Sequence, residues 1–404
     1  MLALRYNPSP LRFAALKVLG RLGSRAFYEG PLATVSLDEV PEPAPPRPGW
    51  VKIKTGMCGF CGSDLNMILL KDSPTVTPFV SFPAIMGHEF FGEVAEVGEG
   101  VKKVAPGDRV AVAPHLNCPT REVEPPCEAC RAGRPGNCEN FARGALSPGL
   151  INGLCRDAGG GFAPLCVVHE SQVYVLPDSL PDLAAVVIEP FAIALQAVAD
   201  NRPRKSDDVL VVGGGVIGSL VVHAIRALGI GCRVTVVEPS PVAAEYAARA
   251  GADEVARDGD IPAAAVRVCG ARSYKPMIGA NVLMGGFDKV FDTVGNSATV
   301  NACLRSMAMG GAISVIGVGH DVTLDLTPLW LKVLTIKGVY AYGNIRHQGK
   351  RRHAFSLAVD LAQKAPSFLA SMVTHRFALK DYKSMIRTNL EKAKHTAMKT
   401  VVVF

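Results

Sequence analysis

The pattern of apolar and polar positions changes about half-way along the chain. From Trp50 to about residue 180, short alternating runs are separated by glycine, proline and aspartate, as in residues 51–61, 92–98 and 108–114. Alternation with a period of two is typical of strands that bury one face. The first half therefore predicts a lobe built of short β-strands.

The second half has a different rhythm. Residues 183–200 form a helical pattern, and from residue 207 onward apolar strand-like runs alternate with amphipathic helical ones. This spacing of βαβ units predicts a parallel sheet with helices on both faces. Further strands are predicted at residues 289–295, 311–318 and 334–343. A helix over 353–365 and a strand over 396–404 should return the chain to the first lobe.

The length agrees with two lobes, because single cores stop growing at roughly 250–300 residues and this chain has 404. We assign residues 1–200 to the first part of the β-rich lobe, 201–340 to the parallel-sheet lobe, and 341–404 to the return. The composition, with 49% hydrophobic and 20% charged residues, is that of an ordinary globular protein.

Charge and hydropathy exclude some partners. The net charge of +7 is spread along the chain apart from one basic cluster at 346–353, which we expect to be a solvated loop or helix start, so nucleic-acid binding is not indicated. The longest apolar run is too short to cross a membrane. Residues 1–30 are basic, and we interpret them as an insert with a short helix over 11–22 rather than a transit peptide. A cytoplasmic location is expected.

A glycine-rich turn follows the first strand of the predicted parallel sheet. Gly213, Gly215 and Gly218 match G-x-G-x-x-G at the start of a helix. The first glycine allows the tight turn, the second lets a pyrophosphate approach the backbone, and the third lets helix and strand pack closely. The candidate cofactor-binding residues here are Gly213, Gly215, Val216, Ile217 and Gly218.

An acidic residue completes this fingerprint. Glu238 lies about 20 residues further on, at the end of the next predicted strand, where a carboxylate accepts hydrogen bonds from the adenosine ribose hydroxyls. A carboxylate there repels a 2′-phosphate, and the following residues 239–241 offer no arginine to offset it. The sequence therefore predicts NAD(H) as cofactor rather than NADP(H).

Cysteine usage points to metal binding. Eleven cysteines is an odd number and no signal-type apolar run opens the chain, so we expect no disulfide framework. Four of them lie in the Pro/Gly-rich segment 115–140, namely Cys118, Cys127, Cys130 and Cys138. Four thiolates in a loop that no apolar core could order predict a structural zinc site. Glu124 is an alternative fourth ligand, but we prefer Cys118 because thiolate is the softer donor.

A second, reactive metal site is also indicated. The Cys-x-x-Cys spacing of Cys58 and Cys61 is compatible with a redox dithiol, with part of a zinc site, or with coincidence. His88, Glu89 and Glu189 could join one of these thiolates in a Cys/His/carboxylate zinc site with one open position. A thiolate and one carboxylate neutralise Zn²⁺, so charge favours one carboxylate at a time.

The motifs carry a resemblance to a known family. CGSD, GHEFFGEV, GDRVAVAP, the cysteine loop, IEP and VLVVGGGVIG occur in the order seen in zinc-dependent medium-chain alcohol dehydrogenases, particularly the sorbitol and threonine dehydrogenase branch. The resemblance runs from about residue 40 to the C-terminus. It implies an α/β protein with a GroES-like β-barrel catalytic domain and a Rossmann doubly wound parallel-sheet domain, with the active site in the cleft. A homodimer or homotetramer is also implied.

The same resemblance assigns roles to the candidate ligands. The cysteine directly before Gly-Ser-Asp, Cys61, would be the catalytic zinc ligand, and Cys58 a packing residue. His88 would be the second ligand, and Glu189, or alternately Glu89, would complete the set.

The resemblance also has departures. Ser63 would bond the substrate oxygen and pass its proton onward, but Asn66 stands where the branch often has a relay histidine, so the proton path must differ or pass through water. The cysteine loop has a six-residue insertion after Cys118. Residues 272–286 and the N-terminal insert match nothing in the family.

The expected activity is oxidation of a secondary alcohol or polyol, or reduction of the ketone or aldehyde, by hydride transfer to or from nicotinamide, with two zinc ions per chain. The expected partner is a small alcohol or ketone, with no nucleic acid and no membrane. One alternative is a metal-independent enoyl or quinone-type reductase of the same fold. The other is a non-catalytic NAD-binding redox sensor.

Overall fold

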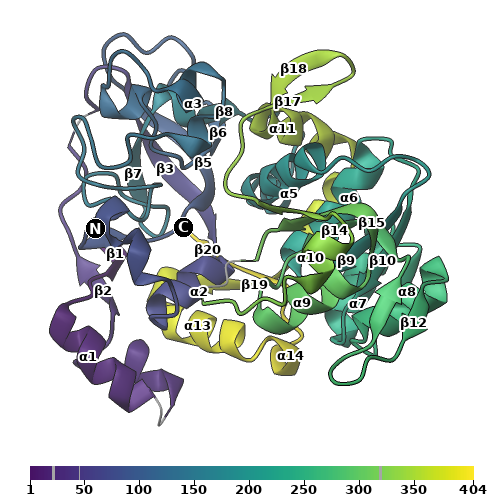
Figure 1. Cartoon of the computed structure of the whole chain (residues 1–404). Helices are drawn as coiled ribbons and strands as arrows, with labels where there is room; N and C mark the ends of the chain where they lie inside the picture. Colours follow the sequence, from purple (N-terminus) through teal and green to yellow (C-terminus); the bar gives the residue numbers. More distant parts are fainter. Residues whose placement is uncertain (21–22, 45, 318–320) are drawn as a thin grey trace. The chain divides into compact units, whose positions relative to one another are not determined.

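The computed structural model describes the chain except for residues 21–22, 45 and 318–320. It consists of two compact units (Figure 1). Unit 1 comprises Met1–Glu189, Tyr342–Asn344 and Phe355–Phe404, and unit 2 comprises Pro190–Ala341 and Ile345–Ala354. The domain boundaries predicted from the sequence, at 1–200, 201–340 and 341–404, stay a prediction.

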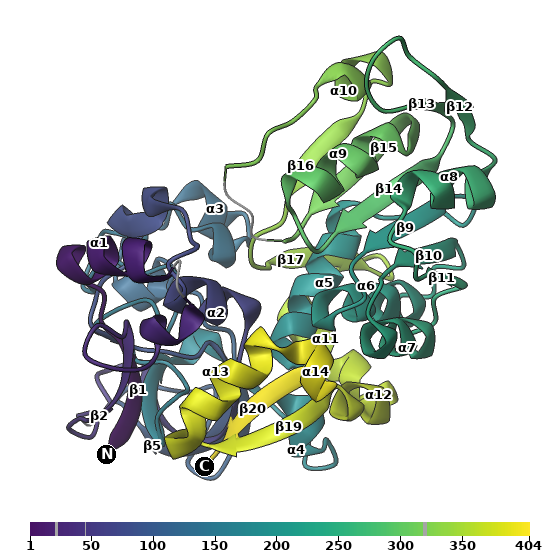
Figure 2. The same ribbon diagram turned by 90° about the horizontal axis from the view of Figure 1, so that it is seen from below.

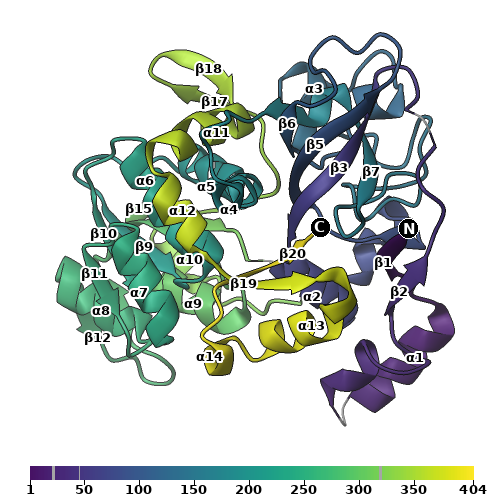
Figure 3. The same ribbon diagram turned by 180° about the vertical axis from the view of Figure 1, so that it is seen from behind.

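Unit 1 is centred on a seven-stranded sheet. Its order is β19-β20-β3-β5-β6-β8, with β7 also paired to β3. The C-terminal strand β20 lies antiparallel to β3, so the end of the chain closes the sheet that the first half begins (Figure 3). The strands are β3 (Trp50–Gly59), β5 (Glu89–Val97), β6 (Arg109–Val112), β7 (Leu165–His169), β8 (Val173–Val175), β19 (Val373–Ala378) and β20 (Lys399–Val403).

The first strand of the N-terminal insert belongs to a second, smaller sheet. Strand β1 (Leu2–Tyr6) pairs antiparallel with β2 (Val35–Glu39) and β4 (Ala84–Ile85). Helix α1 (Pro10–Leu19) follows β1, and the Ser9 hydroxyl caps it by accepting from the Arg12 N–H at 3.2 Å. The helix predicted over 11–22 is confirmed up to Leu19, and residues 21–22 lie outside the described part. The strands of this sheet were not predicted.

The remaining helices of unit 1 are short and surround the sheet. They are α2 (Gly62–Ile68), α3 (Glu128–Arg131), α4 (Asp182–Ala185), α11 (Ala354–Lys364), α12 (Pro366–Ser371), α13 (Tyr382–Leu390) and α14 (Lys392–His395). Short 3₁₀ helices include η3 (Pro74–Phe79) and η4 (Pro119–Arg121).

Unit 2 is a six-stranded parallel sheet, as the βαβ pattern predicts. Its order is β11-β10-β9-β14-β15-β16, and every pairing is parallel. The chain winds outward from β9 on one side and from β14 on the other, so the order reverses between these two strands. Such a switch point is where α/β sheets bind ligands, at the carboxyl ends of the strands. The strands are β9 (Asp208–Val212), β10 (Arg233–Val237), β11 (Glu254–Ala256), β14 (Phe287–Asp292), β15 (Met307–Val315) and β16 (Thr335–Gly338).

Helices cover both faces of this sheet (Figure 2). Helices α6 and α7 pack together on one face, and α8 and α9 pack together on the other. The helices are α5 (Ile188–Asp200), α6 (Val216–Ala227), α7 (Pro241–Arg249), α8 (Ile261–Cys269), α9 (Ser297–Arg305) and α10 (Thr327–Leu331). In the part of the chain that is described, no helix has the length and apolarity needed to cross a membrane.

Two hairpins were not predicted from the sequence. Residues 272–286, which match nothing in the family that the sequence resembles, form a hairpin of β12 (Arg272–Tyr274) and β13 (Val282–Met284). The basic cluster at 346–353, expected as a loop or helix start, pairs instead as β17 (Asn344–His347) and β18 (Lys350–His353). Gln348 and Gly349 both have positive φ, +48° and +76°, the backbone that a two-residue hairpin turn requires.

Candidate functional site

Cys61 lies in the turn between β3 and α2. It occupies the N-cap of α2, and its backbone N–H donates to Asp64 Oδ2 at 2.9 Å. Asp64 is 2% exposed, so this bond is shielded from water. The short chain segment between strand and helix is thereby fixed with Cys61 at its corner.

The same carboxylate faces His88, the residue just before β5. Asp64 Oδ1 lies 3.4 Å from His88 Nδ1, while His88 Nε2 lies 3.4 Å from Ser63 Oγ. Burial lowers the pKa of His88, but Asp64 and Cys61 outweigh it and raise this pKa well above its usual value. A carboxylate on one ring nitrogen orients a histidine so that the other nitrogen can bind a metal.

Glu89 is paired with a lysine from the other end of the chain. Lys399, on β20, contacts the Glu89 carboxylate and donates to the Phe60 carbonyl at 3.3 Å. Burial lowers the pKa of Lys399, but Glu89 and Cys61 raise it above its usual value. Gly59 leaves room for this pair, since a Cβ there would lie 2.8 Å from Lys399 Cε.

These groups converge on one place within unit 1. Ligand atoms of Cys61, His88 and Glu89 all lie within 4.8 Å of one another. Thiolate, imidazole and carboxylate are all zinc donors, and three protein ligands leave a position open for substrate. The donor set therefore fits a catalytic zinc ion.

Glu189 is near this group but not part of it. Glu189 is 7% exposed and is the second residue of helix α5. Burial and then the charge of Glu89 raise the pKa of Glu189 to about 7, against the opposing influence of His88, Lys399 and Tyr342. Its role as the third ligand stays a prediction, because the nearer carboxylate is that of Glu89.

Cys58 is not a member of this group of candidate ligands. It is fully buried within the core cluster that includes Val51, Ile53 and Phe90. Burial, with the charges of Asp64 and Glu89, raises the pKa of Cys58 well above its usual value. A thiol in this setting stays protonated and inert.

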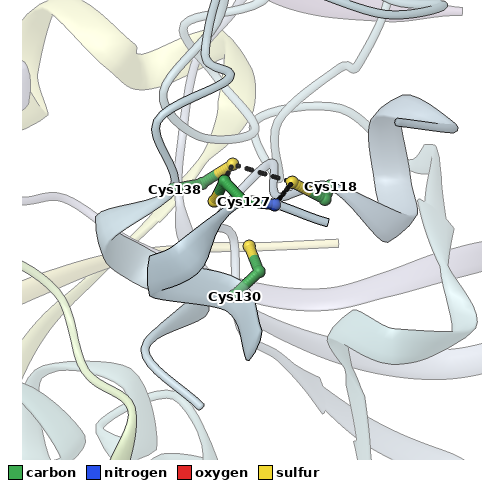
Figure 4. A group of neighbouring side chains, drawn as sticks. All are labelled: Cys118, Cys127, Cys130 and Cys138. Atoms are coloured by element: carbon green, nitrogen blue, oxygen red, sulfur yellow. Dashed lines mark hydrogen bonds between the residues drawn. The ribbon is translucent and has the colours of Figure 1, made fainter. Parts of the chain in front are cut away.

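The four cysteines of the loop face one another (Figure 4). The sulfur of Cys138 lies 3.6 Å from that of Cys118 and 3.9 Å from that of Cys127. A tetrahedron with zinc–sulfur bonds of about 2.3 Å has edges of about 3.8 Å, so these separations fit a structural zinc ion. Glu124, the alternative ligand, is not in the described group of four.

Hydrogen-bond donors surround the loop sulfurs. The Cys127 N–H donates to Cys118 at 3.3 Å, the Asn140 N–H to Cys138 at 3.3 Å, and Asn140 Nδ2 to Cys118 at 3.2 Å. Such donors offset thiolate charge and fix the direction in which each sulfur points. Asn140 was not singled out in the sequence analysis.

Arg121 is a further residue that sequence reasoning missed. It lies in the insertion after Cys118 and is fully buried, and its guanidinium donates to backbone carbonyls over residues 143–149 at 2.6–3.3 Å. Burial lowers the pKa of Arg121, while the charges of Cys155, Cys138 and Cys118 act in the opposite direction. Four thiolates around Zn²⁺ would leave two negative charges for this cation to offset. The insertion therefore supplies a cation that ties the loop together.

The glycine turn in unit 2 has the geometry of a phosphate site. Gly213 has φ of +88°, and a Cβ on Gly218 would collide with the Gly213 carbonyl. A Cβ on Gly215 would meet nothing within 4 Å, so the backbone there is open to a ligand. Helix α6 starts after Gly215 with no side chain capping it, which leaves its first N–H groups for an anion. Val216 and Ile217 form the first turn of this helix.

Glu238 lies at the end of β10, against the glycine turn. Its carboxylate accepts from the Gly214 N–H and from the Ser240 N–H, each at 2.7 Å. Thr293, at the end of β14, donates to the Val212 carbonyl at 2.7 Å. The acid is thus held against the glycine turn, at the carboxyl end of β10 and one strand away from the switch point.

Comparison with known proteins identifies the family. Residues 47–178 match the alcohol dehydrogenase GroES-like domain, and residues 216–364 match the zinc-binding dehydrogenase family. The chain therefore belongs to the zinc-dependent medium-chain alcohol dehydrogenases, and it is an oxidoreductase.

The relatives agree with this family. Sorbitol dehydrogenase of Bacillus subtilis is 28% identical over 74% of this chain and 77% of its own. The (R,R)-butanediol dehydrogenase of the same organism is 29% identical over 86% and 90%. A crystal structure of 2R,3R-butanediol dehydrogenase from Bacillus subtilis has a TM-score of 0.73 and 25% identity, covering 100% of both chains. The predicted fold class, a GroES-like domain with a Rossmann domain, is confirmed.

The role of Arg121 can be tested by Arg121→Ala. We expect the zinc content to fall from about two to about one per chain, and the free energy of unfolding to fall by about 3 kcal/mol, because an anionic cluster loses its buried cation. Metal analysis and thermal unfolding measure both. The exposed Arg134 of the same loop provides the control, and Arg134→Ala should change neither. Equal zinc content in the two variants would contradict the role.

Proposed function

We propose that this chain is a zinc- and NAD(H)-dependent dehydrogenase that oxidises a secondary alcohol or polyol, or reduces the corresponding ketone or aldehyde. The convergence of Cys61, His88 and Glu89 within 4.8 Å supports this most directly. A reductase that works without a metal has no need of a thiolate, an imidazole and a carboxylate directed at one point. The reaction partners are the small alcohol and its carbonyl product.

The proposed ligands of the catalytic zinc are Cys61, His88 and a carboxylate from Glu189 or Glu89. When bound there, zinc supplies Lewis acidity that makes a substrate hydroxyl acidic enough to lose its proton at neutral pH. The structural zinc is assigned to Cys118, Cys127, Cys130 and Cys138.

The surrounding residues orient and deprotonate the substrate. Asp64 keeps His88 in one orientation through Nδ1, at 3.4 Å. Ser63 accepts the hydrogen bond of the substrate hydroxyl and takes up its proton while its own hydroxyl proton leaves. Its Oγ lies 3.4 Å from Nε2 of the proposed ligand His88. The amide of Asn66 cannot take up this proton, so we propose that water carries it onward from Ser63.

Lys399 allows two carboxylates near one metal. A thiolate and one carboxylate already neutralise Zn²⁺, so a second carboxylate would leave the site anionic. Lys399 is buried against Glu89 and offsets that charge. Glu89 and Glu189 can therefore both remain close to the ligands, and either can complete the set.

The proposed cofactor is NAD(H). The phosphates are assigned to the turn of Gly213, Gly215 and Gly218 and the start of α6, and the ribose hydroxyls to Glu238. The hydrogen bonds from Gly214 and Ser240 fix the carboxylate of Glu238 in place. A fixed negative charge there disfavours a 2′-phosphate.

We further propose that the chain assembles as a homodimer, either as the final state or as half of a homotetramer. In the described sheet of unit 2, β16 is an edge strand, and an edge strand is a template for pairing with another chain. Large apolar side chains beside it are exposed, among them Trp330 at 67% and Val333 at 72%. Antiparallel pairing of two β16 strands would bury these side chains.

We place the protein in the cytoplasm. All eleven cysteines are free thiols, and both proposed zinc sites need thiolates, which a reducing compartment preserves. Cell fractionation would test this location.

The catalytic ligand can be tested with Cys61→Ala. We expect kcat/KM to fall about a thousandfold or more, because the metal that acidifies the hydroxyl is lost, while NADH binding measured by fluorescence remains. Cys58→Ala, which changes a thiol three residues away in the core, should retain activity and both zinc ions. Activity that survives Cys61→Ala would overturn the assignment.

Cofactor preference can be tested with Glu238→Ala. We expect the KM for NADP to fall about tenfold and the KM for NAD to rise, since a repelling charge and a ribose partner disappear together. Steady-state kinetics with both cofactors measures the change. An unchanged ratio of the two KM values would remove Glu238 from the ribose site.

Assembly can be tested with Trp330→Glu. A charge placed in an interface centre should raise the dimer dissociation constant about tenfold or more, as measured by light scattering on a sizing column. Leu11→Glu, at a position 84% exposed on α1 in unit 1, is the matched control and should leave the mass unchanged. A monomeric parent protein would contradict the proposal outright.

A further inference from the structure

An apolar cavity of about 160 Å³ lies in unit 1 at the C-terminal end of α2. Its walls come from three parts of the chain: the N-terminal insert, the end of α2 with the following η3, and the loop around residue 150. The side chains that matter for the argument are Tyr6, Phe13, Met67, Val76, Phe82 and Leu154.

The N-terminal insert forms one wall and is anchored firmly. The Tyr6 hydroxyl donates to the Met67 carbonyl at 3.1 Å, and its ring packs edge-on against Phe82 at 5.0 Å. Lys17, on α1, donates to the Leu70 carbonyl at 3.3 Å. The insert precedes the first family match, which begins at residue 47.

The cavity begins close to the proposed reaction centre. Ser63 and Met67 are four residues apart on α2 and therefore lie on the same face of the helix, about 5–6 Å apart at Cβ. Ser63 is the residue that the proposed mechanism places on the substrate hydroxyl. The helix thus leads from the reacting oxygen to the apolar wall.

The chemistry of the lining selects the ligand. Apart from a few side chains such as Asp72 and Thr77, the walls are apolar. Hydroxyls of a polyol would lose their hydrogen bonds to water there without gaining partners. A cavity of about 150 Å³ lined by aliphatic and aromatic groups holds a benzene ring in another protein, so an aryl or branched alkyl group fits.

We propose that this cavity binds an apolar substituent of the substrate, so that the enzyme prefers secondary alcohols carrying an aryl or branched alkyl group over polyols. This inference rests on the proposed dehydrogenase function. Phe13 and Val76 serve as specificity-determining residues, because they wall the cavity and are not among the proposed metal ligands.

The test fills the cavity with a bulky side chain. Val76 is 38% exposed at the cavity, and Val18 is 67% exposed on α1 outside it, so Val76→Trp and Val18→Trp form a matched pair. Calorimetric titration with toluene measures binding to the zinc-loaded full chain. We expect Val76→Trp to weaken toluene binding at least about tenfold and Val18→Trp to leave it unchanged.

A second pair opens the wall instead of filling the cavity. Phe13→Ala should weaken toluene binding several-fold, whereas Leu11→Ala, on the exposed side of α1, should not. In kinetics, Val76→Trp should raise the KM for 1-phenylethanol about tenfold while the KM for 2-propanol stays within about twofold.

The outcomes separate this inference from the function on which it rests. Equal toluene affinity in Val76→Trp and Val18→Trp, or a higher kcat/KM for sorbitol than for 1-phenylethanol in the parent enzyme, would overturn the inference and leave the dehydrogenase proposal standing. Toluene binding that depends on Val76 in a protein inactive on every alcohol would overturn the proposed function and the substrate assignment with it.

Discussion

One buried carboxylate, Asp64, connects the parts of the candidate active site. One of its oxygens accepts the backbone N–H of Cys61, and the other faces Nδ1 of His88. A strand–helix turn and the start of the neighbouring strand are thus held together by a group that is 2% exposed. Because water cannot compete for these contacts, the separation of a sulfur from an imidazole nitrogen is fixed before any metal arrives.

Charge compensation is the second constraint. The carboxylates of Glu89 and Glu189 are both buried, and burial, followed by the charge of Glu89, raises the pKa of Glu189 to about 7. Among the residues that the structure describes, Lys399 is the cation that contacts Glu89. It comes from β20, and β20 pairs with β3, the strand that leads into Cys61. The return of the chain to its first lobe therefore completes the electrostatics of the site as well as the sheet.

Local signals could be predicted from the sequence, and long-range contacts could not. The alternating strands, the βαβ rhythm and the glycine turn depend on neighbouring residues, and the structure confirms these elements. Lys399 is 310 residues from Glu89, and its own surroundings in the sequence give no sign of a buried partner. Arg121 resembles a surface arginine in a loop, because the carbonyls that bind it become accessible only when the loop closes. The hairpin at 346–353 was not predicted, because the many charges of this segment were interpreted as a solvated loop or helix start. The Gln-Gly turn within it was overlooked.

The two proposed metal centres differ in how much of the fold each requires. The four sulfurs of the structural site come from one loop of 21 residues between Cys118 and Cys138, so zinc can gather them as that loop closes. The candidate catalytic ligands come from the β3–α2 turn and the start of β5, and they depend on Lys399 from β20 near the C-terminus. That centre exists only when the whole of unit 1 has folded. A zinc ion held there by three protein ligands would be bound less tightly than one held by four, because one position would stay open for substrate. A fourth thiolate would strengthen zinc binding at the structural site. At the proposed catalytic site, we infer that preorganisation by Asp64 and charge compensation by Lys399 strengthen it instead.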